Sequence, residues 1–106
     1  MLINLTPHVL NVHTPDGVVD LPASGQVARV ATSETSVGEV AGVPVTTTTF
    51  GEVTGLPEPA PGVWLVVSML VRTAAEAAGR RDVLSPGPLV RDAEGRPVGC
   101  RGLTRG

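Results

Sequence analysis

The sequence has few residues of several kinds, and each shortage excludes a class of protein. It contains no lysine and no tyrosine, and Phe50 and Trp64 are its only aromatic residues. With so few aromatic side chains, a base-stacking platform for single-stranded nucleic acid is poorly supported. The single cysteine, Cys100, cannot form an internal disulfide, and the opening MLINLTPH has neither a basic leader nor a long apolar segment. We therefore expect a cytoplasmic protein.

Motifs that indicate common chemistries are missing as well. The longest apolar run is interrupted by Ser68 and Arg72, so no segment approaches the roughly 20 apolar residues of a membrane span. No C-x-x-C or H-x-x-x-H pair suggests zinc, no Walker or G-x-G-x-x-G loop suggests a bound nucleotide cofactor, and Ser68 lacks the flanking glycines of a nucleophile elbow. We expect no metal, no cofactor and no assembled catalytic set.

Charge is unevenly distributed along the chain. The net charge is −2, but residues 1–79 hold two arginines against seven acids, whereas residues 80–106 hold six arginines against three acids. The isoelectric point near 5.5 argues against duplex nucleic acid as a partner. A basic end can bind an anion, because an arginine fork grips phosphate or carboxylate with two parallel hydrogen bonds. The alternative is that these arginines are surface solubilisers, some of them paired with nearby acids.

Length and composition favour one β-rich domain. The 106 residues include 13 glycines, 10 prolines and many valines, a composition typical of short strands joined by frequent turns. We predict a single α+β domain over residues 1–106, mostly antiparallel β. It should have six to seven short strands in a sandwich-like or barrel-like arrangement, with one helix.

Residues 62–79 contain both the predicted central strand and the predicted helix, around which the other strands are expected to pack. Residues 63–67 form a continuous apolar, β-branched run, which suits a central strand buried on both faces. Ser68 is then the N-cap of a helix that Gly79 closes, with Arg72 and Glu76 four residues apart on its outer side. The residues expected to line the inner stripe of this helix are Leu70, Ala74, Ala77 and Ala78.

Short strands and turns are predicted before this segment. Residues 3–13 read as one strand with a bend near Pro7, and residues 18–21 return as its hairpin partner after a turn at Asp16-Gly17. Residues 26–32 read as a third strand and residues 33–36 as a loop. A second hairpin joins residues 37–40 to residues 43–50, and residues 51–62 form a stiff, proline-rich connection.

The end of the chain is predicted to be a third hairpin. Residues 80–88 read as a compact loop, and residues 89–91 and 97–101 read as strands around an Asp92–Gly95 turn. This hairpin would bring Arg91, Arg96 and Arg101 near one another, in an arrangement able to bind an anion. Residues 102–106 are expected to be frayed.

Candidate ligand-binding residues come from both ends of the chain. The alternation near the N-terminus places an amide, a hydroxyl and an imidazole on one strand face, although such a row is also typical of the wet face of an edge strand. Arginines, with neighbouring polar residues, supply the anion-binding groups. The candidates are Asn4, Thr6, His8, Arg29, Arg81, Asp82, Ser85, Arg91, Arg96 and Arg101.

Five segments of the sequence resemble a known family. They are INLTPH at residues 3–8, SGQVARV at 24–30, TFGEVTGLP at 49–57, and SPG with VRD at 85–87 and 90–92. In these the chain resembles a family of small proteins encoded in actinobacterial genomes and by phages. The resemblance implies a setting rather than residue roles. Small accessory proteins of phages and prophages often bind something of the host, including nucleotide-derived immune signals.

These observations lead to three functional hypotheses. The first is a homo-oligomeric protein that binds a small anionic, nucleotide-like ligand without turning it over, possessing no membrane partner and no cofactor. The second is a protein-interaction or structural module that oligomerises through edge strands and the proline-rich loop. The third is a small hydrolase or transferase that uses His8 or Cys100.

Overall fold

The computed structural model describes all 106 residues and contains ten strands and one helix. About half of the residues, 51%, lie in strands and 8% lie in the helix, which confirms the predicted α+β class. The strands form two four-stranded sheets and one two-stranded ribbon, and no barrel closes. The elements are β1 (Leu2–Asn4), β2 (Leu10–Thr14), β3 (Gly17–Leu21), β4 (Arg29–Val40), β5 (Val43–Thr54), β6 (Trp64–Val66), α1 (Met69–Ala77), β7 (Val83–Pro86), β8 (Leu89–Arg91), β9 (Pro97–Arg101) and β10 (Leu103–Thr104).

The first sheet, in the order β1-β6-β7-β10, holds the core. Strands β1, β6 and β7 run parallel, and β10 is antiparallel to β7. Strand β6 is central, as predicted, because Leu65 and Val66 bury both of its faces. Leu65 packs in one apolar cluster with Leu5, Val71 and Val83.

Helix α1 packs against this sheet and begins where the sequence predicts. The Ser68 hydroxyl accepts a hydrogen bond from the Val71 backbone N–H (3.2 Å), which satisfies one of the free donors of the first turn. The buried residues are Val71, Ala74 and Ala75, and Leu70 is 52% exposed. Of the residues predicted for the inner stripe only Ala74 is buried; Leu70, Ala77 and Ala78 are exposed, because the helix turns the larger Val71 toward the core.

The second sheet, in the order β3-β2-β9-β8, contains both terminal hairpins predicted from the sequence. Strands β2 and β3 pair antiparallel around the turn at Asp16-Gly17, and β8 and β9 pair antiparallel around residues 92–95. The prediction of one bent strand over residues 3–13 is wrong, because β1 belongs to the first sheet and β2 to the second. The chain leaves β1 at Leu5, whose backbone N–H bonds to Val66 and whose carbonyl accepts from Ala28.

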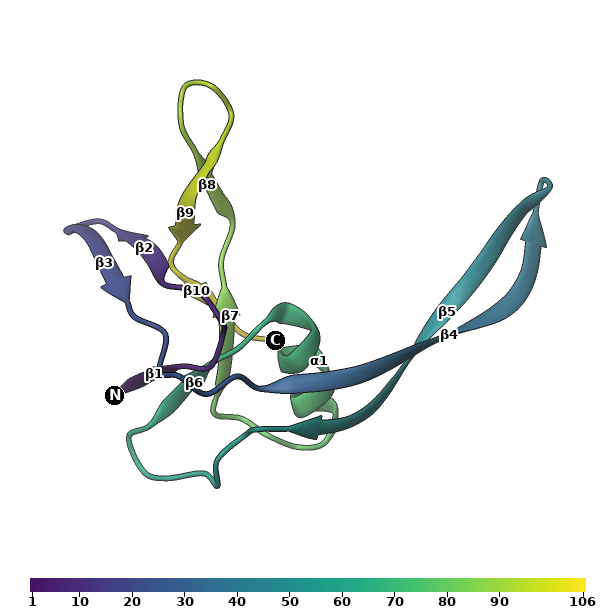
Figure 1. The fold of residues 1–106 in the computed structure, drawn as a ribbon, viewed down its shortest axis with the longest axis horizontal. Helices are drawn as coiled ribbons and strands as arrows, with labels where there is room; N and C mark the ends of the chain where they lie inside the picture. The colour runs from purple at the N-terminus through teal and green to yellow at the C-terminus, as the bar shows by residue number, and fades with distance from the viewer.

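Strands β4 and β5 form a long two-stranded hairpin, here called the arm, which projects from the rest of the molecule, the body (Figure 1). Both strands are 12 residues long and turn at Ala41-Gly42. The hairpin turn was predicted, but the loop expected at residues 33–36 is strand, and residues 26–28 precede the strand rather than forming part of it. Polar Ser, Glu and Thr residues can continue a strand here because every residue from 31 to 44 is exposed.

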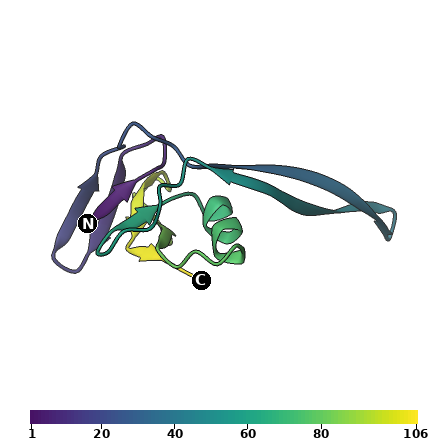
Figure 2. The same ribbon diagram turned by 90° about the horizontal axis from the view of Figure 1, so that it is seen from below.

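The arm gives the molecule an elongated shape. Its extents are 49 × 41 × 22 Å, and its radius of gyration is 16.2 Å, compared with about 13 Å for a compact chain of this length. A view from below shows the arm leaving the body beside α1 (Figure 2). The one helix is far shorter and less apolar than a membrane-crossing helix has to be.

Two segments near the C-terminus are more ordered than predicted. Residues 83–86, expected in a loop, form β7 and pair with β6 in parallel. Residues 103–104, expected to be frayed, form β10 and pair with residues 85–86 of β7. Neither pairing leaves much signal in the sequence, because both strands are short and neither is joined to its partner by a tight hairpin turn.

Candidate anion-binding site

An open cavity of about 410 Å³ lies where the proline-rich connection enters β6 and where α1 leads into β7. Two of the predicted ligand-binding residues, Arg81 and Asp82, line it. The complete lining consists of Pro59, Gly62, Val63, Trp64, Gly79, Arg80, Arg81 and Asp82.

The end of α1 places the two neighbouring arginines at this cavity. Gly79 adopts a φ of +97°, a left-handed conformation that glycine accepts without strain. Its N–H bonds to the Glu76 carbonyl (3.0 Å), and the Arg80 N–H bonds to the Ala75 carbonyl (3.0 Å), so the helix ends in a closed, Schellman-type turn. Arg80 and Arg81 follow this turn directly.

Arg80 is engaged within the protein. Its Nε and Nη2 donate to the two oxygens of Asp82 (3.0 and 2.8 Å), and Nη2 also donates to the Pro57 carbonyl (2.8 Å). The hydrogen bond from Arg80 lowers the pKa of Asp82, and the same bond raises the pKa of Arg80. This bidentate pair anchors the proline-rich connection to the start of β7. Because Asp82 stays ionised and has both oxygens occupied, it is unsuited to act as a general base.

Two other arginines beside the cavity have no carboxylate partner. Arg81 is exposed, and neither it nor Arg105 forms an ion pair or a side-chain hydrogen bond within the chain. The guanidinium carbon of Arg105 lies 6.0 Å from the centroid of the Trp64 ring, at the limit of a cation–π contact. The cavity lining therefore combines the Trp64 ring with the unpaired guanidinium of Arg81, and Arg105 lies beside the same ring.

The predicted polar row near the N-terminus is used inside the fold. Asn4 and Thr6 are buried, with exposed fractions of 3% and 8%. The Asn4 amide donates to the carbonyls of His8 (2.8 Å) and Leu21 (3.0 Å), while its oxygen accepts from the N–H (2.9 Å) and hydroxyl (2.6 Å) of Thr6. His8, the third residue of the predicted row, is exposed. Asn4 and Thr6 thus hold the segment between β1 and β2 in place through hydrogen bonds, and their side chains are not accessible to solvent.

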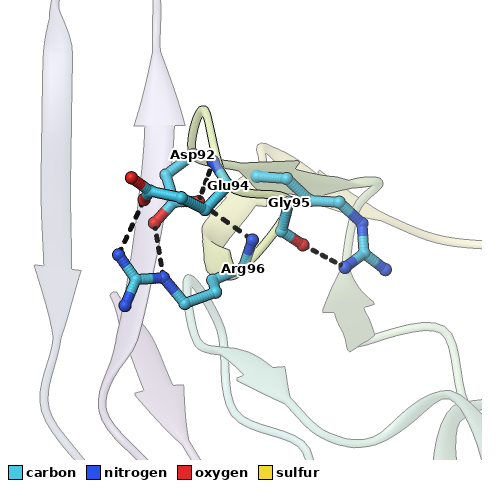
Figure 3. Close-up of polar contacts among 5 residues, drawn as sticks. Asp92, Glu94, Gly95 and Arg96 are labelled. Atoms are coloured by element: carbon cyan, nitrogen blue, oxygen red, sulfur yellow. Dashed lines mark hydrogen bonds and ion pairs between the residues drawn. The ribbon is translucent and has the colours of Figure 1, made fainter.

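The arginines of the C-terminal hairpin are partly engaged within their own turn (Figure 3). Arg96 pairs with Asp92 (3.1 Å) and Glu94 (2.8 Å), and Arg91 donates to the Gly95 carbonyl (2.8 Å). Arg101 lies four residues beyond Pro97, the partner of Arg91, and lines a separate cavity of about 300 Å³ with His13, Thr14 and Pro15. The structure therefore brings Arg91 and Arg96 to one turn and places Arg101 elsewhere.

The remaining predicted residues lie apart from the cavity. Ser85 is fully buried in β7, and its hydroxyl has no hydrogen-bond partner. Arg29 is exposed at the start of β4, opposite Thr54. Cys100 is buried, so its thiol is not presented as a surface nucleophile. No three His, Cys, Asp or Glu side chains are placed so that they could hold a metal ion.

Sequence reasoning missed Trp64, which lines the cavity, and Arg105, which lies beside its ring. The apolar pattern predicts that Trp64 belongs to a buried strand, although a large residue with a polar N–H at the start of such a strand often remains half-exposed. Arg105 falls within the terminal segment that the sequence predicts to be frayed. The pairing of β10 with β7 places it near the ring, and a two-residue strand has too little pattern to predict.

Comparisons with known proteins add no family to this description. The chain matches no family model, no curated protein and no solved structure.

Proposed function

We propose that the protein binds a small anionic, nucleotide-like ligand at the cavity beside Trp64 and releases it unchanged. The observation that carries the proposal is the combination of the Trp64 ring with Arg81 and Arg105, neither of which is neutralised by a carboxylate. An aromatic ring provides a stacking surface for a base, and an arginine fork matches the geometry of phosphate.

The chemistry of the cavity favours binding over turnover. Its titratable side chains are Arg80, Arg81 and Asp82. Arginine stays protonated in proteins, and the pKa of Asp82 is lowered by Arg80, so the lining supplies neither a nucleophile nor a base poised near neutral pH. In the phage and prophage setting implied by the sequence resemblance, such a ligand would be a nucleotide-derived immune signal, which the protein would withdraw by sequestration.

Trp64 makes the proposal directly testable by fluorescence. It is the only tryptophan and there is no tyrosine, so the intrinsic emission reports on the cavity alone. We expect the emission to change on titration with adenosine mono- and triphosphate and with cyclic dinucleotides, and chromatography should recover each ligand intact. Equal binding of adenosine would contradict the role of the anion, and equal binding of inorganic phosphate would contradict the role of the ring. An absence of any change with the whole series would overturn the proposal.

A matched pair of arginine variants locates the site. Arg81→Ala should weaken binding by about 1 to 3 kcal/mol, the usual contribution of a charged hydrogen bond. Arg29→Ala is the control, because Arg29 is also exposed and without an ion pair but lies at the base of the arm. Equal loss of affinity in both variants would show a non-specific charge effect instead of a site.

A further inference from the structure

The two faces of the arm differ in charge. Glu34 and Glu39 share one face with Thr46 and Thr48, whose hydroxyls donate to the Glu34 carboxylate (3.1 and 3.0 Å). The cross-strand pairs on the opposite face bear no charge, because they consist of Ser, Thr, Gly and Val residues. That face holds Ser33, Thr35, Gly38, Val40, Val43, Val45, Thr47 and Thr49.

The free end of the arm is apolar and exposed. Val37, Val40 and Val43 have exposed fractions of 62%, 67% and 61%, although valine is among the residues most often buried. We call these three residues the valine tip. The turn that joins them holds Ala41 at a φ of +53°, a strained position for a residue with a Cβ atom. A two-stranded hairpin is marginally stable alone in water, so an arm of this length is typical of an element that a partner covers.

A surface of matching chemistry lies elsewhere on the same chain. A groove of about 370 Å³ runs between the start of β2 and the β8–β9 hairpin, and Val9, Leu89 and Val98 beside it are 57%, 59% and 40% exposed. Arg91 lies two residues from Leu89 on strand β8 and is exposed. The groove is lined mainly by Val9, Leu10, Pro86, Leu89, Pro97 and Val98.

The charges of the arm and of the groove rim indicate which kind of partner the arm binds. The arm holds Glu34, Glu39 and Glu52 against the single Arg29 at its base, so it is acidic and is repelled by nucleic acid and anionic lipid. The groove lining is uncharged, and the exposed Arg91 on β8 has no carboxylate partner, because its side chain donates only to the Gly95 carbonyl. The arm points away from the β8–β9 hairpin of its own chain, so its tip does not reach its own groove (Figure 1).

We propose that the valine tip of one copy docks in the groove of a second copy, with Glu39 beside Arg91. This contact joins two different surfaces, and it closes into a pair when it is made reciprocally. It buries apolar side chains that each chain exposes, and it places opposite charges at the rim. The proposal is independent of ligand binding, because neither surface includes Trp64 or Arg81.

Variants of the tip and of the groove test the two halves of the contact. Val43→Glu places a charge in the tip, and Leu89→Glu places one in the groove. Val18→Glu is the control, since Val18 is exposed to a similar degree (55%) on β3. By light scattering after size-exclusion chromatography, we expect an oligomer for the wild type and the control, and a single-chain mass for both variants. Circular dichroism would confirm that each variant is folded.

Mixing the two variants makes the test specific. The Leu89→Glu chain retains its tip and the Val43→Glu chain retains its groove, so one intact contact should form between them. Native mass spectrometry should therefore detect a mixed pair that neither variant forms alone. A single-chain mass for the wild type, an unchanged oligomer for either variant, or no mixed pair would overturn the proposal.

A charge exchange examines the rim of the contact. Glu39→Arg and Arg91→Glu should each weaken the oligomer about 10-fold or more, because each places like charges together. The double variant should recover most of the loss. If the double variant is as weak as the two single variants combined, Glu39 and Arg91 are not neighbours and the proposed orientation is wrong.

Discussion

The body and the arm use similar residues in opposite ways. Strand β6 is three residues long, but Leu65 and Val66 are almost fully buried between its neighbours. Strands β4 and β5 are four times longer, yet no residue from 31 to 44 is buried. Strand length therefore does not indicate stability in this chain. The body is stabilised by apolar burial, whereas the arm is held mainly by its own ladder of hydrogen bonds.

The largest expected difference between the two regions concerns apolar side chains. Leu65→Ala should reduce the free energy of unfolding by about 2 to 5 kcal/mol, because it leaves a cavity in the core cluster. Val37→Ala, measured in the Leu89→Glu chain so that no second copy covers the tip, should change it by less than about 0.5 kcal/mol, since the side chain is 62% exposed. Urea denaturation measures both values. A similar loss in both variants would contradict the distinction between the buried side chains of the body and the exposed side chains of the arm.

Polar networks should show the same contrast on a smaller scale. Asn4→Ala removes four hydrogen bonds and leaves buried partners unpaired, so we expect a loss of about 3 kcal/mol. Glu34→Ala removes two hydrogen bonds that lie on the exposed arm, and the loss should be below about 1 kcal/mol. Thermal unfolding of both variants provides the comparison. Equal shifts in Tm would indicate that burial does not decide the contribution of these networks.

The Arg80–Asp82 pair should make part of the stability of the body depend on pH. The folded-state pKa of Asp82 is lowered, so its contribution is fully present above the unfolded-state value near 4 and is lost as the pH falls through the folded-state value. Asp82→Asn should therefore destabilise the protein by about 1 to 2 kcal/mol at neutral pH. The difference from the wild type should shrink below about pH 4. Denaturation at several pH values checks this, and a constant difference down to pH 2 would contradict it.

The smallest expected effect is a gain of stability in the arm. Ala41→Gly relieves the left-handed strain at the turn and should stabilise the hairpin by about 1 kcal/mol. Hydrogen exchange should slow in residues 32–50 and stay unchanged in β6. Slower exchange in β6 would show that the arm and the body unfold as one unit, contrary to the distinction drawn between them.

The features predicted correctly from the sequence are those with a local chemical signal. The Ser68 cap, the apolar run of β6, and the turns at Asp16-Gly17, Ala41-Gly42 and Asp92–Gly95 each depend on a few adjacent residues. The missed features depend on distant pairing. Strand β7 is ordered by β6, residues 33–36 are extended by Thr46–Thr49 across the ladder, and Asn4 separates β1 from β2 through carbonyls at His8 and Leu21.

The candidate site was predicted only in part, for the same reason. Arg81 and Asp82 follow the predicted end of the helix, and their placement at a cavity fits the sequence pattern. Trp64 and Arg105 are 41 positions apart and meet only because β10 joins the first sheet. The engagement of Arg96 by Asp92 and Glu94 depends on the geometry of one turn, which charge counts do not reveal.

The close contact between the two ends of the arm determines which changes of sequence the fold can accommodate. Gly55 adopts a φ of +84°, and a Cβ atom there would overlap the Val27 carbonyl oxygen and press on Ala28, so the two strands of the arm enter and leave the body side by side. The arm is thus an insertion whose two ends lie side by side, and every strand of the body comes before or after it in the sequence. Lengthening, shortening or replacing the arm would leave the body sheets intact, so the length of the arm can vary independently of the core.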